Sequence, residues 1–430
     1  MSHNLNFKKF SFLVYGLGAT GHSVIKYFKK NNFINFFAWD DNIKLRNKIK
    51  TKKILNLKNI LQKVDYIVLS PGISLKKNKY KKDLIKYKEK IITDIDILYL
   101  SNTHFRSIVV TGSNGKSTTC KIITHLLKKN KFNVELGGNI GKPVLDLKIK
   151  KNSYLIIEAS SFQLSHSKHI RPDYAILLNI TNDHVDWHGS MSSYTKSKLK
   201  IFNLQKKNNF ALINKDFRKD FRKNNFLGKF VPIKFKNYKK LKHKIKNEYL
   251  KSNINDENMN FVYTLSKLLK ISNNSFIKSM KTFIGLPHRY ETFFKKKNIT
   301  FINDSKATSL QAAKFALTNG KNIYWIVGGL PKYKDKINLK LVKNNIIKSY
   351  IIGKNTNFFK KQLIGKIKFS VTKKLNNTII KVLKDIRLHK KINNIVLLSP
   401  GAASYDQFKN FENRGNEFKR LSKLYAKKYI

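Results

Sequence analysis

The residues best suited to chemistry lie in one short turn, Thr111–Thr118, which reads TGSNGKST. An apolar run ending at Val110 precedes this turn and a helical pattern begins at Lys116, so the segment predicts a strand, a loop and a helix. Glycines let backbone N–H groups close around phosphate oxygens, and the N-terminus of a helix favours an anion. Lys116 would then reach the outer phosphates, and the Ser117 hydroxyl could bind Mg²⁺. The turn therefore predicts binding of a nucleoside triphosphate.

Two further side chains are candidate cation ligands. Glu158 follows the apolar run Tyr154–Ile157, so it stands at the end of an expected strand, where a carboxylate can bind Mg²⁺ beside a phosphate loop. His184, at the end of the segment Asn179–His184, could bind a second cation through its imidazole. Each has a structural alternative, because Glu158 could cap a helix and His184 could orient loop backbone.

A second glycine-containing turn, Gly16–Gly21, reads GLGATG and follows the apolar residues Phe12–Tyr15. Asp40 lies 19 positions after Gly21, just beyond the expected strand Ile34–Trp39. This spacing matches the dinucleotide fingerprint, in which an acidic residue follows the turn by about 20 residues. Two interpretations stay open, the nicotinamide site of a dehydrogenase and a site for another nucleotide. A dehydrogenase would leave the phosphate loop without a purpose.

Repeated strand–loop–helix patterns divide the 430 residues into three expected domains and predict an α/β fold. Residues 1–95 would form a Rossmann-like domain, 96–285 a central P-loop ATPase-like parallel sheet, and 286–430 a second Rossmann-like, doubly wound parallel sheet. Peripheral strands and variable loops are expected over 206–251, and Ile284–Pro287 is the expected linker. Ligands of such folds gather at the carboxyl ends of the strands, where the motifs lie. The remaining expected elements are the strands Tyr66–Leu69, Tyr174–Leu178, Ile299–Ile302, Ile323–Val327, Tyr350–Ile352 and Ile395–Leu398 and the helices Asn258–Lys270 and Ser309–Leu317.

The formal net charge is +63, from 88 Lys and Arg residues against 25 Asp and Glu residues. These cations are spread over the whole length, which favours a solvated surface; a nucleic-acid-binding ATPase is the alternative from another class. No apolar run approaches the ~18 residues of a spanning helix, and the N-terminal pattern is too short for a signal peptide. The only cysteine, Cys120, is expected to be a buried structural thiol. We therefore expect a cytoplasmic protein without a membrane span.

Six motifs together resemble those of the Mur ligases of peptidoglycan synthesis, in order and over essentially the whole chain. They are Thr111–Thr118 (TGSNGKST), Gly138–Gly141 (GNIG), Glu158–Leu164 (EASSFQL), Asn179–Asp186 (NITNDHVD), Asn303–Thr308 (NDSKAT) and Ser399–Gly415 (SPGAASYDQFKNFENRG). The resemblance implies a monomeric, ATP-dependent amide ligase with two Mg²⁺ ions, which adds D-glutamate to UDP-N-acetylmuramoyl-L-alanine through an acyl phosphate. Relatives that add diaminopimelate or lysine carry an Asp-Asn-Pro-Arg or Asp-Asn-Pro-Lys type of motif, which is not found here. Folylpolyglutamate synthetase lacks the UDP-binding first domain.

The resemblance also implies roles for individual residues. The implied catalytic residues are Lys116, Glu158, His184 and Lys198, and the implied metal ligands are Ser117, Glu158, His184 and Lys198. The implied ATP contacts are Gly112, Ser113, Asn114, Gly115, Lys116, Ser117, Thr118, Asn258, Arg289, Asp304 and Lys306. The implied contacts to the UDP substrate are Ala19, Thr20, Asp40, Asp41, Ser70, Gly72 and Asn139. The implied D-glutamate contacts are Thr308, Lys332, Ser404 and Phe411, whose cation and hydroxyls suit a dicarboxylate.

Two details of the resemblance bear on the site. Lys198 matches the lysine that related ligases carry as a carbamate, which turns an ammonium into an anionic oxygen ligand able to bridge toward Mg²⁺. Related ligases usually carry a His-Asn pair three residues before another Asn, and the counterpart here is Ile254, Asn255 and Asn258, without the histidine. The motifs therefore support the phosphate contacts more strongly than an adenine contact through Asn258.

Overall fold

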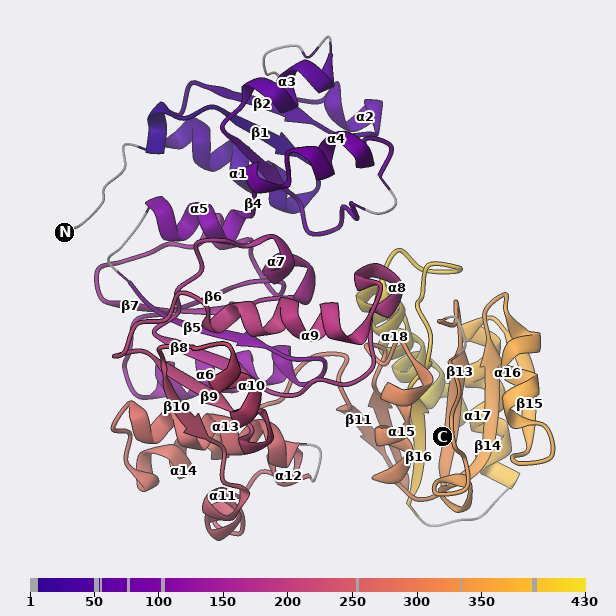
Figure 1. The fold of residues 1–430 in the computed structure, drawn as a ribbon. Coiled ribbons are helices and arrows are strands. Elements are labelled where there is room, and N and C mark those ends of the chain that lie inside the picture. Colours follow the sequence, from indigo (N-terminus) through magenta and orange to yellow (C-terminus); the bar gives the residue numbers. More distant parts are fainter. Residues whose placement is uncertain are drawn as a thin grey trace. The chain divides into compact units, whose positions relative to one another are not determined.

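The structure is a computed structural model that describes residues 7–49, 54, 56–75, 78–101, 105–252, 255–332, 335–388 and 393–430. The chain divides into two compact units, residues 1–283 and 284–430. Figure 1 shows two sheets in the first unit and one in the second, each accompanied by helices. The predicted α/β architecture with a parallel central sheet is confirmed. None of the described helices is long and apolar enough to cross a membrane.

The N-terminal sheet is parallel, in the strand order β2-β1-β3-β4. Its strands are β1 (Phe12–Tyr15), β2 (Phe36–Trp39), β3 (Tyr66–Leu69) and β4 (Ile91–Ile92). The accompanying helices are η1 (Phe7–Lys9), α1 (Ala19–Lys30), α2 (Ile43–Arg46), α3 (Leu57–Lys63), α4 (Lys81–Lys86) and η2 (Lys88–Lys90). In β1, Phe12 and Val14 pack in the apolar cluster that includes α1, whereas Leu13 and Tyr15 pack in the cluster that includes α3 and α4. The unbroken apolar run of this strand therefore follows from its burial on both faces.

The central sheet is also parallel, in the order β10-β9-β8-β5-β7-β6. Its strands are β5 (Phe105–Thr111), β6 (Val134–Gly138), β7 (Ser153–Glu158), β8 (Tyr174–Leu177), β9 (Phe210–Ile213) and β10 (Lys229–Pro232). The helices of this part are α5 (Asp94–Ser101), α6 (Lys116–Lys129), η3 (Val144–Asp146), α7 (Ser161–His166), α8 (Val185–His188), α9 (Met191–Leu199), η4 (Lys200–Phe202), η5 (Lys215–Phe217), α10 (Arg218–Lys223), α11 (Phe235–Lys242), α12 (Glu248–Lys251), α13 (Asn255–Leu268) and α14 (Asn273–Lys281). Because β5 pairs with both β7 and β8, the segments that follow these three strands begin at one edge of the sheet.

One continuous apolar core joins the two sheets of the first unit. It includes Val24 and Phe28 of α1, Ile95 of α5, Val144 of η3 and Val109 of β5, all of them inaccessible to solvent. The helices α1 and α5 both contact η3. Burial of this apolar surface stabilises the N-terminal and central sheets as one packed unit.

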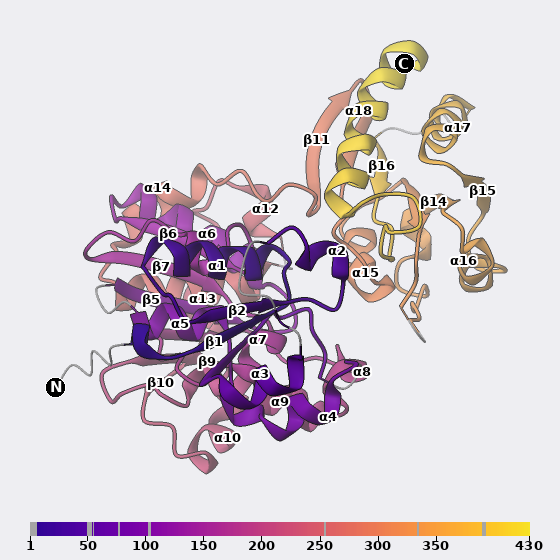
Figure 2. The same ribbon diagram turned by 90° about the horizontal axis from the view of Figure 1, so that it is seen from above.

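The second unit contains a six-stranded sheet in the order β11-β12-β16-β13-β14-β15. Its elements are β11 (Glu291–Lys296), β12 (Ile299–Asn303), α15 (Leu310–Thr318), β13 (Ile323–Gly328), η6 (Lys343–Asn345), β14 (Ile346–Ile352), α16 (Thr356–Leu363), β15 (Phe369–Lys373), α17 (Leu375–Leu388), β16 (Asn394–Leu398) and α18 (Phe411–Tyr429). One apolar cluster joins the sheet to α15 and α16, and another joins it to α17 and α18, so helices cover both faces. Figure 2 shows α16 and α17 on opposite sides of β15.

Two expectations need correction. The second unit's sheet is not purely parallel, because β11 pairs with β12 in the antiparallel sense at the edge. In this edge strand Thr292 and Lys295 are exposed and the other four residues are half-buried, so it lacks the apolar run that marks the inner strands. Residues 206–251 hold β9 and β10 as expected, but also the helices α10, α11 and α12. Lysine-rich and asparagine-rich composition hides the periodicity of these short helices.

We predict that Gly21→Ala destabilises the first unit, because a Cβ at Gly21 would lie 1.9 Å from the Gly16 carbonyl oxygen. Overpacking of this kind typically costs about 1–3 kcal/mol, so the midpoint of thermal unfolding should fall. Gly18→Ala is the matched control in the same turn, since no atom lies within 4 Å of its added Cβ and its φ is −74°. Equal unfolding midpoints for the two variants would contradict the close approach of α1 to the turn.

Candidate active site

The phosphate loop is held by the segment that follows β8. The Ser113 N–H donates to the Asn179 carbonyl (2.9 Å), and the Asn114 N–H donates to Asn179 Oδ1 (2.9 Å). Gly115 closes the loop with φ +83° as the N-cap of α6, and a Cβ there would lie 2.2 Å from Asn258 Oδ1. Glycine is therefore required at this position by backbone conformation and by space together.

Two lysine amines converge on one carbonyl of this loop. Lys116 Nζ donates to the carbonyl oxygens of Gly112 (2.7 Å) and Ser113 (2.9 Å), and Lys198 Nζ donates to the same Gly112 oxygen (2.8 Å). Lys198 is 1% exposed. Its burial lowers the pKa to about 6, and the charge of Lys116 lowers it further while Asp183 opposes the shift. At neutral pH the amine of Lys198 is therefore mostly uncharged.

Glu158 is the buried carboxylate at the end of β7, where it pairs in register with Val110 of β5. Its Oε1 accepts a hydrogen bond from Asn139 Nδ2 (2.8 Å), whereas Oε2 has no hydrogen-bond partner among the described residues. The residue is 2% exposed. A buried carboxylate oxygen without a partner is costly, and a hard cation is the ligand that it suits. Glu158 therefore fits a Mg²⁺ ion beside the loop.

His184 follows β8 in a left-handed conformation, with φ +52°. Its N–H donates to Asp183 Oδ1 (3.0 Å), and its Nε2 lies 3.4 Å from Asp183 Oδ2. The ring of Phe162 packs against the imidazole at a centroid distance of 4.8 Å. A non-glycine residue in this conformation stores strain, which is common where a side chain is aimed at a function.

Tyr194 is a member of the site that the sequence reading missed. Its hydroxyl forms a hydrogen bond with Ser113 Oγ (2.9 Å), which also donates to the Thr181 carbonyl (3.1 Å). Lys198 Nζ lies 4.7 Å from the centroid of the Tyr194 ring. The two residues are four positions apart on α9 and so share a face of the helix. That spacing was a signal that could have found Tyr194.

The remaining predicted ATP residues of the first unit lie on α6 and α13. Ser117 and Thr118 are buried in the first turn of α6. Asn258 Oδ1 accepts from Thr119 Oγ1 (3.2 Å), and its Nδ2 donates to Asn255 Oδ1 (3.2 Å). Asn258 thus contacts the helix of the phosphate loop, and its role toward adenine stays a prediction. Ile254 lies outside the described residues.

The predicted UDP-substrate residues other than Asn139, which follows β6 and bonds to Glu158, surround the first glycine turn. Ala19 and Thr20 lie in the first turn of α1. Asp40 accepts the N–H groups of Leu17 (2.7 Å) and Asn42 (2.8 Å), one on each carboxylate oxygen. Its carboxylate thus shapes the turn.

The other predicted residues of this turn differ in how firmly they are held. Asp41 accepts from the Tyr15 hydroxyl (2.8 Å), and the Ser70 hydroxyl donates to the Gly16 carbonyl (2.8 Å). Gly72 has no atom within 4 Å of an added Cβ and so faces open space. Contacts of any of these residues to a substrate stay predictions.

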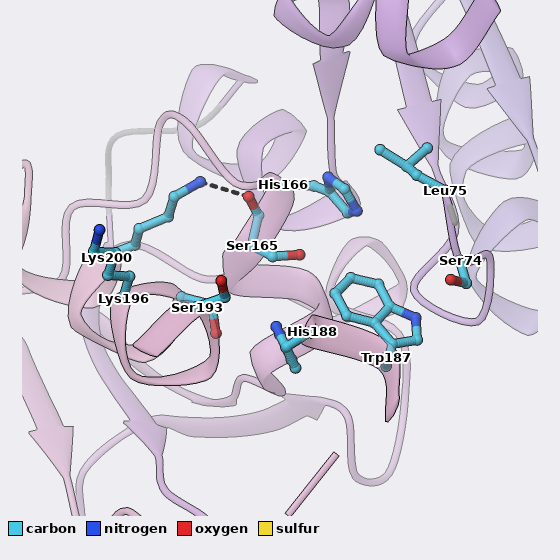
Figure 3. Close-up of a pocket in the computed structure, with 10 residues that line it drawn as sticks. Ser74, Leu75, Ser165, His166, Trp187, His188, Ser193, Lys196 and Lys200 are labelled. Atoms are coloured by element: carbon cyan, nitrogen blue, oxygen red, sulfur yellow. Dashed lines mark hydrogen bonds between the residues drawn. The ribbon is translucent and has the colours of Figure 1, made fainter. Parts of the chain in front are cut away.

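A cavity of about 330 Å³ lies next to this region in the first unit, as Figure 3 shows. It is lined by Ser74, Leu75, Ser165, His166, Trp187, His188, Ser193, Lys196, Ser197 and Lys200. Burial lowers the pKa of His166 to about 4, and its Nε2 has no hydrogen-bond partner in the described part of the chain. The lining positions of α9 differ from that of Lys198, which faces the loop. None of the predicted site residues lines this cavity.

In the second unit the predicted ATP residue Asp304 is buried at the end of β12. Its Oδ2 accepts from the Ser399 hydroxyl (2.7 Å) and its Oδ1 from the Tyr290 N–H (3.1 Å). Burial raises the pKa of Asp304 to about 7, although these hydrogen bonds and the charge of Arg289 oppose the shift. The carboxylate is therefore close to its titration point at neutral pH.

The predicted D-glutamate residues lie on the loops that follow β12, β13 and β16 and at the start of α18. The backbones of Leu330 and Ala403 exchange two hydrogen bonds (2.8 and 2.9 Å), which ties the loop of Lys332 to that of Ser404. Lys306 Nζ lies 3.7 Å from the centroid of the Phe411 ring. Thr308 follows Lys306 on the same loop. The fold thus gathers all four residues at one edge of the sheet.

The parallel central sheet, the phosphate loop and the buried carboxylate beside it define an α/β nucleotide-binding enzyme. Family profiles match the MurD-like N-terminal domain of Mur ligases over residues 10–92 and the Mur ligase middle domain over residues 110–281. The chain is 35% identical to the UDP-N-acetylmuramoylalanine–D-glutamate ligase of Rickettsia felis (96% of this chain, 97% of the relative). It is 36% identical to that of Buchnera aphidicola from Schizaphis graminum (98% and 99%). The chain belongs to the Mur ligase family.

Solved structures share the fold at low sequence identity. The MurF ligase of Thermotoga maritima, in complex with ADP, has a TM-score of 0.58 at 17% identity and is covered over 100% of both chains. The MurC ligase of the same organism has a TM-score of 0.55 at 14% identity, over 97% of this chain and 100% of that one. The chain therefore shares the fold of these two ligases.

We predict that Asp304→Asn weakens the pH dependence of stability. Because folding raises the pKa of this carboxyl from 3.8 to about 7, the folded state binds more protons between these values. Wild-type stability should therefore fall as the pH rises from about 4 to about 7. The amide oxygen can still accept from the Tyr290 N–H, and the amide nitrogen can donate to Ser399 Oγ, so both contacts remain without the charge. The fall should therefore be smaller in scans of thermal unfolding. The exposed Asp216→Asn is the control, and an unchanged pH profile for Asp304→Asn would contradict the buried charge.

Proposed function

We propose that this chain joins D-glutamate to UDP-N-acetylmuramoyl-L-alanine in peptidoglycan synthesis, with hydrolysis of ATP to ADP and phosphate. The observation that carries the proposal is the pairing of the phosphate loop with Glu158, whose unpartnered buried oxygen suits a cation beside that loop. Relatives of the same length that bear this activity in their names support the choice of substrates.

The proposed reaction has two steps, formation of an acyl phosphate and formation of an amide. The substrate carboxylate attacks the terminal phosphoryl group of ATP and forms an acyl phosphate. ADP is the leaving group. The amine of D-glutamate then attacks the acyl carbon, loses a proton and expels phosphate, so that an amide remains. When bound, Mg²⁺ would offset the repulsion between the anionic phosphate and the carboxylate.

The residues of the loop account for the first step. Lys116 lies over the loop and would stabilise charge that develops on the transferred phosphate. Ser117, Glu158 and His184 would hold cations, and Asn139 would keep the Glu158 carboxylate oriented through its hydrogen bond. Lys332, Thr308 and Ser404 would bind the two carboxylates of the amino acid.

Lys198 is proposed to act as a carbamate. Its neutral amine can attack CO₂, forming a C–N bond and releasing a proton, which gives an N-carboxylate. A charged ammonium in this buried position beside Lys116 would repel a cation, whereas the carbamate would bind one. The lowered pKa of Lys198 supports this reaction because it supplies the unprotonated amine at neutral pH.

The proposal also covers the cellular location and the oligomeric state of the protein. Its substrates are nucleotide-linked precursors and ATP, so we assign it to the cytoplasm, where it would act as a monomer with two Mg²⁺ ions. The surplus of positive charge is assigned to a solvated surface.

The function is tested by phosphate release from ATP, with UDP-N-acetylmuramoyl-L-alanine and a panel of D-glutamate, L-glutamate, D-aspartate, diaminopimelate and lysine. We expect release only with the UDP substrate and D-glutamate together. Lys116→Ala should lower kcat by about 100-fold or more, the size of losing one electrostatic contact to the transition state. Lys121→Ala, an exposed lysine of the same helix, should leave kcat unchanged. Release stimulated by DNA or RNA without the UDP substrate would overturn the proposal.

The carbamate is tested by carbon-13 NMR after incubation with labelled bicarbonate. Wild-type protein should show a carbamate signal that Lys198→Met lacks and that Lys196→Met, on the cavity side of α9, retains. Because the amine must be unprotonated, the signal should weaken as the pH falls through about 6. No signal at pH 8 with saturating bicarbonate would exclude the modification.

A further inference from the structure

Among the described residues of the second unit, Arg414 is a deeply buried cation that no role above explains. It lies in the first turn of α18, is 1% exposed and is among the largest fully buried side chains of the chain. Burial lowers its pKa to about 10, so the guanidinium keeps its charge at neutral pH. Burying a charge is costly unless the charge is paired and hydrogen-bonded.

The guanidinium of Arg414 bonds to two of the loops that carry the predicted amino-acid contacts. Its Nε donates to Ser305 Oγ (3.0 Å) and its Nη2 to the Ser305 carbonyl (2.9 Å), on the loop after β12. Nη2 also donates to the Ala402 carbonyl (3.0 Å), on the loop after β16. Ser305 Oγ in turn donates to the Phe411 carbonyl (2.8 Å) at the start of α18. These bonds lie within a few residues of Thr308 and Ser404.

The third loop closes over the remaining nitrogen. Gly329, after β13, has φ +131°, and a Cβ there would lie 3.3 Å from Arg414 Nη1 and 2.3 Å from the Ala403 carbonyl. Nη1 itself has no hydrogen-bond partner among the described residues. Glycine therefore makes room for the guanidinium beside the loop that leads to Lys332.

The predicted ATP contacts of this unit are held by other bonds. Ser399 and Tyr290 fix the Asp304 carboxylate. The Lys306 N–H donates to the His288 carbonyl (3.0 Å). Ser305 lies between Asp304 and Lys306 in the sequence, and its hydroxyl joins Arg414 to Phe411, a predicted amino-acid contact.

We propose that Arg414 is a positioning residue for the acidic amino-acid substrate. Its planar fork ties the loop after β12 to the loop after β16, lies beside the loop after β13, and places a fixed positive charge behind the proposed site of a dicarboxylate. Lysine could not replace it, because an ammonium lacks the fork that reaches a hydroxyl and two carbonyls at once. This inference rests on the proposed function.

The test compares Arg414→Lys with Arg420→Lys, an arginine of the same helix whose partner is Glu417 at the surface. For Arg414→Lys we expect the KM for D-glutamate to rise about tenfold, which corresponds to ~1.4 kcal/mol, while the KM values for ATP and the UDP substrate change less than about twofold. Arg420→Lys should change none of them. An unchanged KM for D-glutamate, or an equal rise for ATP, would overturn the inference.

Ser305→Ala keeps the test decisive if Arg414→Lys does not fold. It removes the buried hydroxyl that joins Arg414 to Phe411 and should raise the KM for D-glutamate in the same direction. The variant should still unfold cooperatively, at a thermal midpoint lowered by the two lost hydrogen bonds. If D-glutamate does not stimulate phosphate release by the wild-type protein, the proposed function is wrong instead. The same KM comparison is then made with the amino acid that the panel identifies, and an unchanged KM there would still overturn the role of Arg414.

Discussion

The constraint on which the active site depends is the convergence of two lysine amines on the Gly112 carbonyl. Lys116 arrives from the helix that follows the loop and Lys198 from α9, and both donate to the same oxygen. Two ammonium groups so close to each other repel, and burial makes the repulsion stronger. Burial, with the charge of Lys116 as the smaller cause, lowers the pKa of Lys198 to about 6, so that its amine is mostly unprotonated at neutral pH.

Both units use the same geometric device to bring distant residues together. In the central sheet β5 lies between β7 and β8, so the phosphate loop, Glu158 and His184 follow three neighbouring strands. In the second unit β16 lies between β12 and β13, so the loops that contain Ser305, Ala402 and Gly329 are neighbours as well. Parallel strands present their carboxyl ends at one edge, and a site can therefore be assembled from short segments far apart in sequence.

The sequence predicted those features that depend on local pattern. Strands buried on both faces show as apolar runs, which is why Tyr66–Leu69 was placed without error. The antiparallel edge strand β11 was missed because none of its residues is fully buried, so it shows no apolar run. The hydrogen bonds of Asp40 with backbone and the burial of Arg414 depend on tertiary packing, which no local pattern predicts. For Tyr194 the four-residue spacing from Lys198 was a signal, but its contact with Ser113 was not predictable. The motifs therefore predicted the chemistry, whereas tertiary packing determines how each group is held.

Buried ionisable groups in both units lower the stability of the unliganded protein and would favour the binding of ligands. The neighbour of Lys198 at the loop is another lysine, Glu158 presents an oxygen without a partner among the described residues, and the acceptors bonded to Arg414 are uncharged. Each arrangement lowers the stability of the protein alone. In the proposed function, phosphates, a cation and a dicarboxylate would bring the opposite charges to these places, so their binding would offset that cost. The unfavourable free energy of these buried groups in the unliganded protein would thus favour the binding of three reactants that repel one another in water.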